Sequence, residues 1–210
     1  MPLVAFAPKD CPLCPRLCAF REQNKIKHPD YYNGAVAAFT APKVKLLIVG
    51  LAPGLHGANN TGRPFTADYA GDLLYPTLIK YGFAKGEYKE RADDGLELID
   101  CRITNAVRCV PPENKPTPDE IKTCNQFLKK EIPSLPDVKV ILVLGLIAHQ
   151  AALRALDIKQ SQFKFAHGAM HQAGNLTILN SYHCSRYNTN TGRLTEKMFH
   201  DVFARARSLI

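Results

Sequence analysis

The stretch Val44-Lys-Leu-Leu-Ile-Val-Gly-Leu-Ala-Pro-Gly54 decides the fold of this chain. Its first eight residues form a short apolar run rich in branched side chains, which predicts a strand buried on both faces. The run stops at Ala52-Pro53-Gly54, a sequence typical of a turn. Strands without a polar face occur mainly in parallel sheets that helices cover on both sides. This stretch therefore predicts an α/β protein.

Similar apolar runs occur further along the chain and alternate with helical patterns. Three further apolar runs predict strands over residues 98–107, 138–144 and 176–182. Helical patterns alternate with them over residues 69–81, 118–131, 147–156 and 194–209, with Pro76 as an expected kink and Thr117 as a cap. The alternation predicts a parallel sheet with helices on both faces. Ligands bind beyond the carboxyl ends of such strands, which singles out residues 52–69, 107–117, 145–150 and 183–193.

Length and composition predict one compact domain over residues 1–210. The hydrophobic content is 46%, enough for a sizeable core. Apolar runs stay shorter than the roughly 18 residues that span a bilayer. Residues 1–10 lack the charge pattern of a signal peptide. We therefore expect a cytoplasmic monomer with no membrane partner.

The net charge is +8, from 27 Lys and Arg against 19 Asp and Glu. A basic surface attracts polyanions through phosphate contacts and counterion release. This balance favours a nucleic-acid partner and association with the nucleoid. By itself it is equally typical of an ordinary basic protein.

The chain has seven cysteines, and four of them form a candidate metal site. Cys11 and Cys14 are a Cys-x-x-Cys pair, which can bind one metal centre from a tight turn. Cys109 at the end of the second predicted strand and Cys124 in the following helix can join them. Four thiolates suit either a [4Fe–4S] cluster or Zn²⁺, and the spacing does not decide between the two.

A second ligand set is also open. Cys11, Cys14 and Cys18 form a tight run, and a helix starting at Pro15 would place Cys18 about one turn in. Packing as a small apolar residue is the alternative for Cys18, and also for Cys101 and Cys184.

Two polar loops follow predicted strands. Residues 50–68 are rich in Gly and small polar side chains, and such a loop can present backbone N–H groups to an anion. Residues 181–195 offer His183, Arg186 and Arg193 among hydroxyls and amides, which suits a loop that grips a phosphate backbone.

Together these loops, the four cysteines and residues 104–118 resemble the iron–sulfur uracil-DNA glycosylases, most closely the type-b group, family 5. The likeness extends over nearly the whole chain, including Cys14-Pro-Arg-Leu-Cys-Ala-Phe-Arg21. It implies a three-layer α/β/α fold around a four-stranded parallel sheet. It also implies excision of uracil, and of other deaminated bases such as hypoxanthine, from DNA. By motif position the ligands of a structural [4Fe–4S] cluster are Cys11, Cys14, Cys109 and Cys124.

The resemblance also implies the catalytic residues. Family 4 members have an acidic residue where this chain has Leu51, so Asp68 is expected to replace it; a helix cap is its alternative role. Asn114 matches a type-b active-site residue, with a simple turn as the alternative. His183 matches the histidine that stabilises the departing base.

Base and DNA contacts follow from the same motifs. Phe65 matches the aromatic residue that stacks on the flipped base, with plain core packing as the alternative. Ala52 and Gly54 belong to the same substrate loop. Asn105 departs from the small residue of the type-b group and matches the base-reading Asn of family 4, which would narrow specificity towards uracil. Arg186 and Arg193 are candidate DNA contacts, or merely solvated surface residues.

Two other functions are alternatives to this one. A non-catalytic zinc or iron–sulfur module that binds nucleic acid would not need the pair Asp68 and His183. A phosphate-loop hydrolase or transferase would need a P-loop lysine or a set of metal-binding carboxylates near Gly50, and the sequence has neither there.

Overall fold

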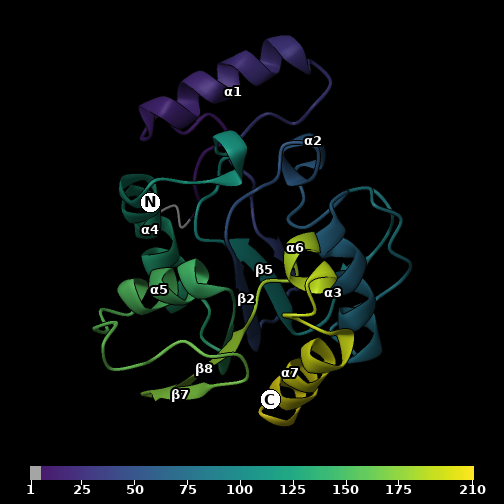
Figure 1. The fold of residues 1–210 in the computed structure, drawn as a ribbon, viewed down its shortest axis with the longest axis vertical. Helices are drawn as coiled ribbons and strands as arrows, with labels where there is room; N and C mark the ends of the chain where they lie inside the picture. Colours follow the sequence, from purple (N-terminus) through teal and green to yellow (C-terminus); the bar gives the residue numbers. More distant parts are fainter. Residues whose placement is uncertain (1–5) are drawn as a thin grey trace.

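In the computed structural model, which describes residues 6–210, a six-stranded sheet has the strand order β1-β5-β2-β6-β8-β7 (Figure 1). Its strands are β1 Phe39–Thr40, β2 Leu46–Gly50, β5 Cys101–Asn105, β6 Val140–Leu144, β7 Met170–Ala173 and β8 Leu176–Ser181. The four inner strands are parallel, and β1 and β7 pair antiparallel at the two edges. The predicted four-stranded parallel sheet is confirmed, and two short edge strands add to it.

Helices cover both faces of the sheet. They are α1 Pro15–Lys27, α2 Ala58–Thr61, α3 Tyr69–Lys80, α4 Pro118–Glu131, α5 Leu146–Ala155, α6 Arg186–Asn190 and α7 Glu196–Ser208. Helices α3 and α7 pack on one face, and α4 and α5 pack on the other. This gives the predicted three layers, while α1 lies outside them at one end of the molecule (Figure 1).

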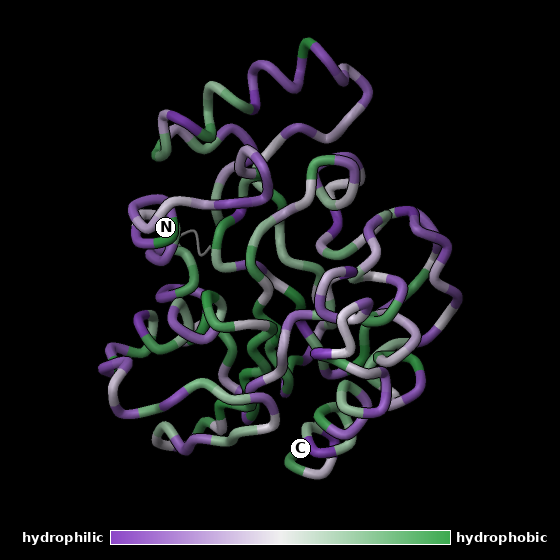
Figure 2. The backbone as a smooth tube through the Cα atoms, viewed as in Figure 1, coloured by the Kyte–Doolittle hydropathy of each residue, from purple (hydrophilic) through white to green (hydrophobic). Residues whose placement is uncertain are grey.

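Strand β2 holds the two halves of the core together. All five of its residues are buried. Leu46 and Ile48 join the cluster beneath α3 and α7, and Leu47 and Val49 join the cluster beneath α4 and α5. Because successive side chains of a strand point to opposite faces, a continuous apolar run is needed for burial on both. Hydrophobic residues accordingly concentrate on the central strands (Figure 2).

The predicted strand over residues 98–107 is wrong as one element. Glu97–Leu98 forms β4, which pairs with β3 Ala84–Lys85 in a separate two-stranded sheet. Asp100 then has a left-handed backbone, with φ of 53°, which ends one strand before β5 begins. Strand β5 also ends early, so Cys109 lies in the following loop, not at the strand's end.

Local signals in the sequence placed the helix boundaries well. Thr117 caps α4 in a capping box with Glu120, and α4 begins at Pro118 as predicted. Helix α3 runs through Pro76 from Tyr69 to Lys80 without interruption. Short 3₁₀ turns occupy Pro112–Asn114 and Ile132–Ser134. Within residues 6–210, no helix is both long and apolar enough to cross a membrane.

Truncation of β2 should test how far the core depends on it. Ile48 has no exposed surface, so we expect Ile48→Ala to lower the free energy of unfolding by about 2–5 kcal/mol, measured in urea. Ile26, 83% exposed on α1, is the control, and Ile26→Ala should change stability by less than about 0.5 kcal/mol. Equal effects of the two substitutions would contradict the proposed core.

Candidate active site

A cavity of about 430 Å³ opens beyond the carboxyl ends of the parallel strands. Six residues singled out by the sequence line it: Ala52, Gly54, Asp68, Asn114, His183 and Arg186. They come from three loops that are far apart in the chain. The fold therefore brings together the three residues expected to be catalytic and part of the expected substrate loop.

Asp68 combines a structural contact with a free acceptor. Its Oδ1 accepts a hydrogen bond from Gly71 N at 3.0 Å and so caps α3. Its Oδ2 faces Gly57, where an added Cβ would lie only 2.9 Å away, and no described residue donates a hydrogen bond to it. Burial raises the pKa of Asp68 to about 6, although the backbone N–H groups of Gly71 and Ala70 oppose the shift. The predicted cap and an open carboxylate oxygen thus coexist.

His183 stands after β8, half-buried at the cavity wall. Burial lowers the pKa of its ring to about 4, so the imidazole is neutral at physiological pH. Asn188 Nδ2 donates to the backbone oxygen of His183 at 2.8 Å and helps to fix this residue. A neutral imidazole still carries one N–H donor, which can stabilise negative charge on a departing group.

Phe65 and Asn105 do not line the cavity and lie around Gly50 instead. A Cβ at Gly50 would collide with Asn105 Oδ1 and with the ring of Phe65. The Phe65 and His183 rings lie 6.1 Å apart and 28° from parallel. Asn105 Oδ1 is buried, and no described residue donates a hydrogen bond to it. Because a buried polar atom without a partner is costly, this acceptor is suited to a donor from a ligand.

Asn114 lies at the exposed mouth of the cavity. Its φ is 57°, and that of the preceding Glu113 is 54°, so two consecutive residues adopt the left-handed region. Asn tolerates this conformation better than most residues. The turn predicted as the alternative role is therefore present, and it directs Asn114 to the cavity.

The two arginines occupy different places. Arg186 lines the main cavity and lies over the Tyr69 ring at 5.2 Å. Arg193 lines an adjoining cavity of about 380 Å³, which shares His183 and Leu51 with the first. Both arginine side chains are exposed, as phosphate contacts require.

Tyr69 was missed by the sequence analysis although it lines the cavity beside Asp68. Thr189 Oγ1 donates to Tyr69 Oη at 3.0 Å, which joins α6 to α3. Its adjacency to Asp68 was the only available signal, and a tyrosine at the first position of a helix is too common to be informative.

The four predicted ligand cysteines line one small cavity together with Cys18. Arg108 N donates to Cys124 Sγ at 3.4 Å, and Cys18 Sγ donates to the backbone oxygen of Cys11 at 3.3 Å. Burial, and then the Cys124 thiol, raises the pKa of Cys14 to about 11. Across residues 6–210, no three His, Cys, Asp or Glu side chains are grouped closely enough to hold a single metal ion.

Comparison with known proteins agrees with this fold. A family model described as the uracil DNA glycosylase superfamily matches residues 37–207. The chain therefore belongs to the uracil DNA glycosylase superfamily, a class of hydrolases that act in DNA repair.

Curated relatives narrow the class. A type-5 uracil-DNA glycosylase of Thermus thermophilus is 43% identical over 205 residues, which cover 95% of this chain and 93% of that protein. One of Pyrobaculum aerophilum is 35% identical over 94% of this chain and 88% of its own length. A type-4 uracil-DNA glycosylase of Archaeoglobus fulgidus is 30% identical over 62% of this chain and 58% of its own length. Within the superfamily, the chain belongs with the type-5 group, and the resemblance noted from the motifs is confirmed.

The raised pKa of Asp68 has a consequence for stability. A folded pKa of about 6, above the ordinary 3.8, means that ionising Asp68 costs stability as pH rises from about 4 to 6. Asn caps a helix as well as Asp does, so we expect Asp68→Asn to stabilise the protein at pH 8 by about 1–3 kcal/mol, and far less at pH 4. Urea unfolding at both pH values measures this.

Asp94 provides the opposite control. Its hydrogen bonds from Arg63 hold the pKa of Asp94 far below its ordinary value, so Asp94→Asn should destabilise the protein at pH 8. A less stable Asp68→Asn variant at pH 8 would show that the ionised carboxylate is not destabilising in the folded protein.

Proposed function

We propose that this chain hydrolyses the N-glycosidic bond of uracil in DNA and leaves an abasic site. The observation that carries the proposal is the meeting of Asp68, Asn114 and His183 in one cavity at the rim of the sheet. Sequence kinship with the type-5 enzymes supports it. A non-catalytic nucleic-acid module would have no use for this arrangement.

Binding begins with DNA phosphates and a base turned out of the helix. The exposed Arg186 and Arg193 flank the two adjoining cavities and would contact phosphates. A base outside the stack can enter a pocket that a paired base cannot reach. Phe65 would stack on it, as aromatic side chains do on nucleobases.

Asn105 would select the base. Uracil carries a hydrogen on N3, and the buried Asn105 Oδ1 is an acceptor in need of a donor. Cytosine has no hydrogen on its N3, so it would leave that acceptor unsatisfied. Hypoxanthine also carries a ring N–H, which keeps it among the candidate substrates, with uracil preferred.

Cleavage sends the electron pair of the glycosidic bond into the leaving uracil, where negative charge grows on O2. The neutral His183 would donate its N–H to that oxygen and lower the barrier. Water then adds to C1′ of the sugar cation. Asp68, ionised above its pKa of about 6, would orient that water through Oδ2 and accept its proton, with Asn114 as a second polar contact.

The catalytic assignments can be tested on uracil-containing oligonucleotides, with alkaline cleavage of the abasic product. We expect Asp68→Asn and His183→Ala each to reduce excision at least about tenfold. Wild-type excision should fall as pH drops below about 6, because protonated Asp68 cannot accept a proton.

The matched controls are Asp201→Asn and His171→Ala, since neither residue lines the site cavities. Both variants should excise uracil at the wild-type rate. Full activity of folded Asp68→Asn and His183→Ala would refute the assigned roles.

We also propose that Cys11, Cys14, Cys109 and Cys124 hold a [4Fe–4S] cluster with a structural role. The four thiols line one cavity, with a backbone N–H donated to Cys124 Sγ, as suits buried thiolate ligands. Zn²⁺ requires four sulfurs at about 2.3 Å from one ion, and within residues 6–210 no three such ligands are grouped closely enough to share a single ion. The cluster would join the N-terminal segment to the rest of a single domain over residues 1–210, acting as a monomer at the nucleoid.

Two cysteine variants separate the possible ligand sets. An iron–sulfur cluster would colour the protein brown. We expect Cys109→Ser to lose this colour and to unfold at lower temperature, because a cluster ligand is gone. Cys18→Ser should keep both, since a hydroxyl can still donate to the Cys11 oxygen. Absorption spectra and iron and zinc content measure the outcome. A colourless, zinc-loaded wild type, or loss of the cluster only in Cys18→Ser, would contradict the assignment.

A further inference from the structure

The loop over residues 63–68, which carries Phe65 and Asp68, has an unfavourable backbone. Phe65 has φ of 56° and Ala67 has φ of 58°, and neither is glycine. Non-glycine residues avoid this region, so such a conformation persists only where surrounding contacts impose it.

Two tyrosine hydroxyls bind the backbone of this loop. Tyr75 Oη donates to Pro64 O at 2.5 Å. Tyr88 Oη accepts a hydrogen bond from Ala67 N at 3.2 Å and donates to Phe65 O at 3.4 Å. Tyr88 therefore holds a peptide group on each side of Thr66, between the two left-handed residues.

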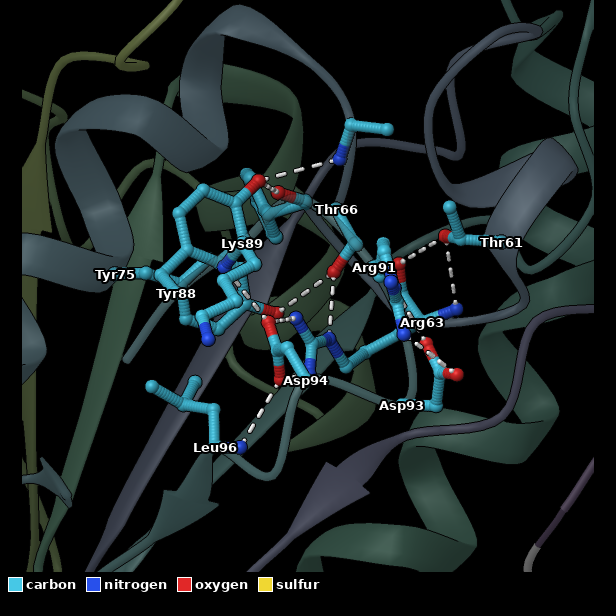
Figure 3. Close-up of polar contacts among 12 residues, drawn as sticks. Thr61, Arg63, Thr66, Tyr75, Tyr88, Lys89, Arg91, Asp93, Asp94 and Leu96 are labelled. Carbon is cyan, nitrogen blue, oxygen red and sulfur yellow. Dashed lines mark hydrogen bonds and ion pairs between the residues drawn. The ribbon is translucent and has the colours of Figure 1, made fainter. Parts of the chain in front are cut away.

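Tyr88 comes from residues 86–96, outside the main sheet, and is itself held by a buried ion pair (Figure 3). Arg63 donates to both carboxylate oxygens of Asp94 at 2.7 Å, and these side chains are 5% and 0% exposed. The Arg63 guanidinium also lies over the rings of Tyr75 and Tyr88, at 5.1 and 5.9 Å. The two tyrosine rings stack at 4.5 Å.

Asp94 also binds the backbone of its own segment, residues 86–96. It accepts backbone hydrogen bonds from Lys89 N at 3.1 Å and Leu96 N at 3.0 Å, on either side of it in the chain (Figure 3). These bonds fix the backbone of segment 86–96 around Asp94. The Tyr88 side chain extends from this segment to the loop over residues 63–68.

Near the start of α3, Gly71 leaves space for the Tyr88 hydroxyl. A Cβ on Gly71 would collide with Phe65 O and would lie 2.6 Å from Tyr88 Oη. Gly71 is also the residue whose N–H caps onto Asp68. The absence of a side chain at this position lets one hydroxyl reach the loop just where Phe65 and Asp68 are fixed.

We propose that Tyr88, supported by the Arg63–Asp94 ion pair, is a positioning residue for base excision, because it imposes the backbone conformation that orients Phe65. This role rests on the proposed function of Phe65 as the surface on which the extruded base stacks. Tyr88 does not line the cavity, so it acts through Phe65 and not on the substrate.

The test is the single-turnover rate of uracil excision with enzyme in excess. Tyr88→Phe removes the hydroxyl and keeps the stacked ring, and we expect it to slow excision at least about tenfold, because both hydrogen bonds between the hydroxyl and the loop are lost. Tyr81→Phe is the control, since the Tyr81 hydroxyl bonds to no described residue, and it should match the wild type. Both variants should remain folded by circular dichroism.

A double-mutant cycle separates positioning from general stability. If Tyr88 acts through Phe65, adding Tyr88→Phe to Phe65→Ala should slow excision by less than about twofold beyond Phe65→Ala alone. Asp94→Asn should likewise slow excision by less than about twofold when it is added to Phe65→Ala. This non-additivity would support the proposal.

Other outcomes would overturn it in distinguishable ways. A wild-type rate for Tyr88→Phe, or a loss that multiplies fully with that of Phe65→Ala, would refute positioning while leaving the role of Phe65 intact. A wild-type rate for Phe65→Ala would refute the stacking role itself, and the positioning role with it.

Discussion

The site depends on the absence of a side chain at the last residue of β2. Gly50 pairs in register with Asn105 of the neighbouring β5, so the amide of Asn105 and the ring of Phe65 meet over its Cα. A Cβ there would displace one or both. Because the register of a parallel sheet is set by its buried residues, the core of the protein also determines where the two groups proposed to face the base lie. The packing of the core and the proposed recognition of the base therefore both depend on Gly50.

Much of the fold could be predicted because its determinants are local. A fully apolar run such as Leu46–Gly50 has few alternatives to a buried strand, and Thr117 with Glu120 forms a cap within four residues. The break between β4 and β5 at Asp100 could not be predicted, since an Asp within an apolar run does not by itself indicate a left-handed backbone. The edge strand Met170–Ala173 has no hydrophobic alternation, and it forms because its backbone pairs with β8.

The site was predictable in part for the same reason. Asp68, Asn114 and His183 follow predicted elements at one rim of the sheet, and the structure places them around one cavity. The pKa shifts of Asp68 and His183 arise from burial, which no local pattern reveals. Tyr88 had no signal at all, because its contacts with Phe65 and Ala67 join segments that only the folded chain brings together.

Helix α1 has a consequence for how the protein is made. Leu17 and Cys11 share a hydrophobic cluster with Val107, Cys124 and Phe127, which all belong to the second half of the chain. The N-terminal helix therefore leaves the ribosome well before the surface that receives it has been synthesised. It stays undocked at least until residues 107–127 have been made. Nascent chains that stall before Phe127 would expose this helix, and the thiols of Cys11, Cys14 and Cys18 in and before it, to chaperones, oxidants and metal ions.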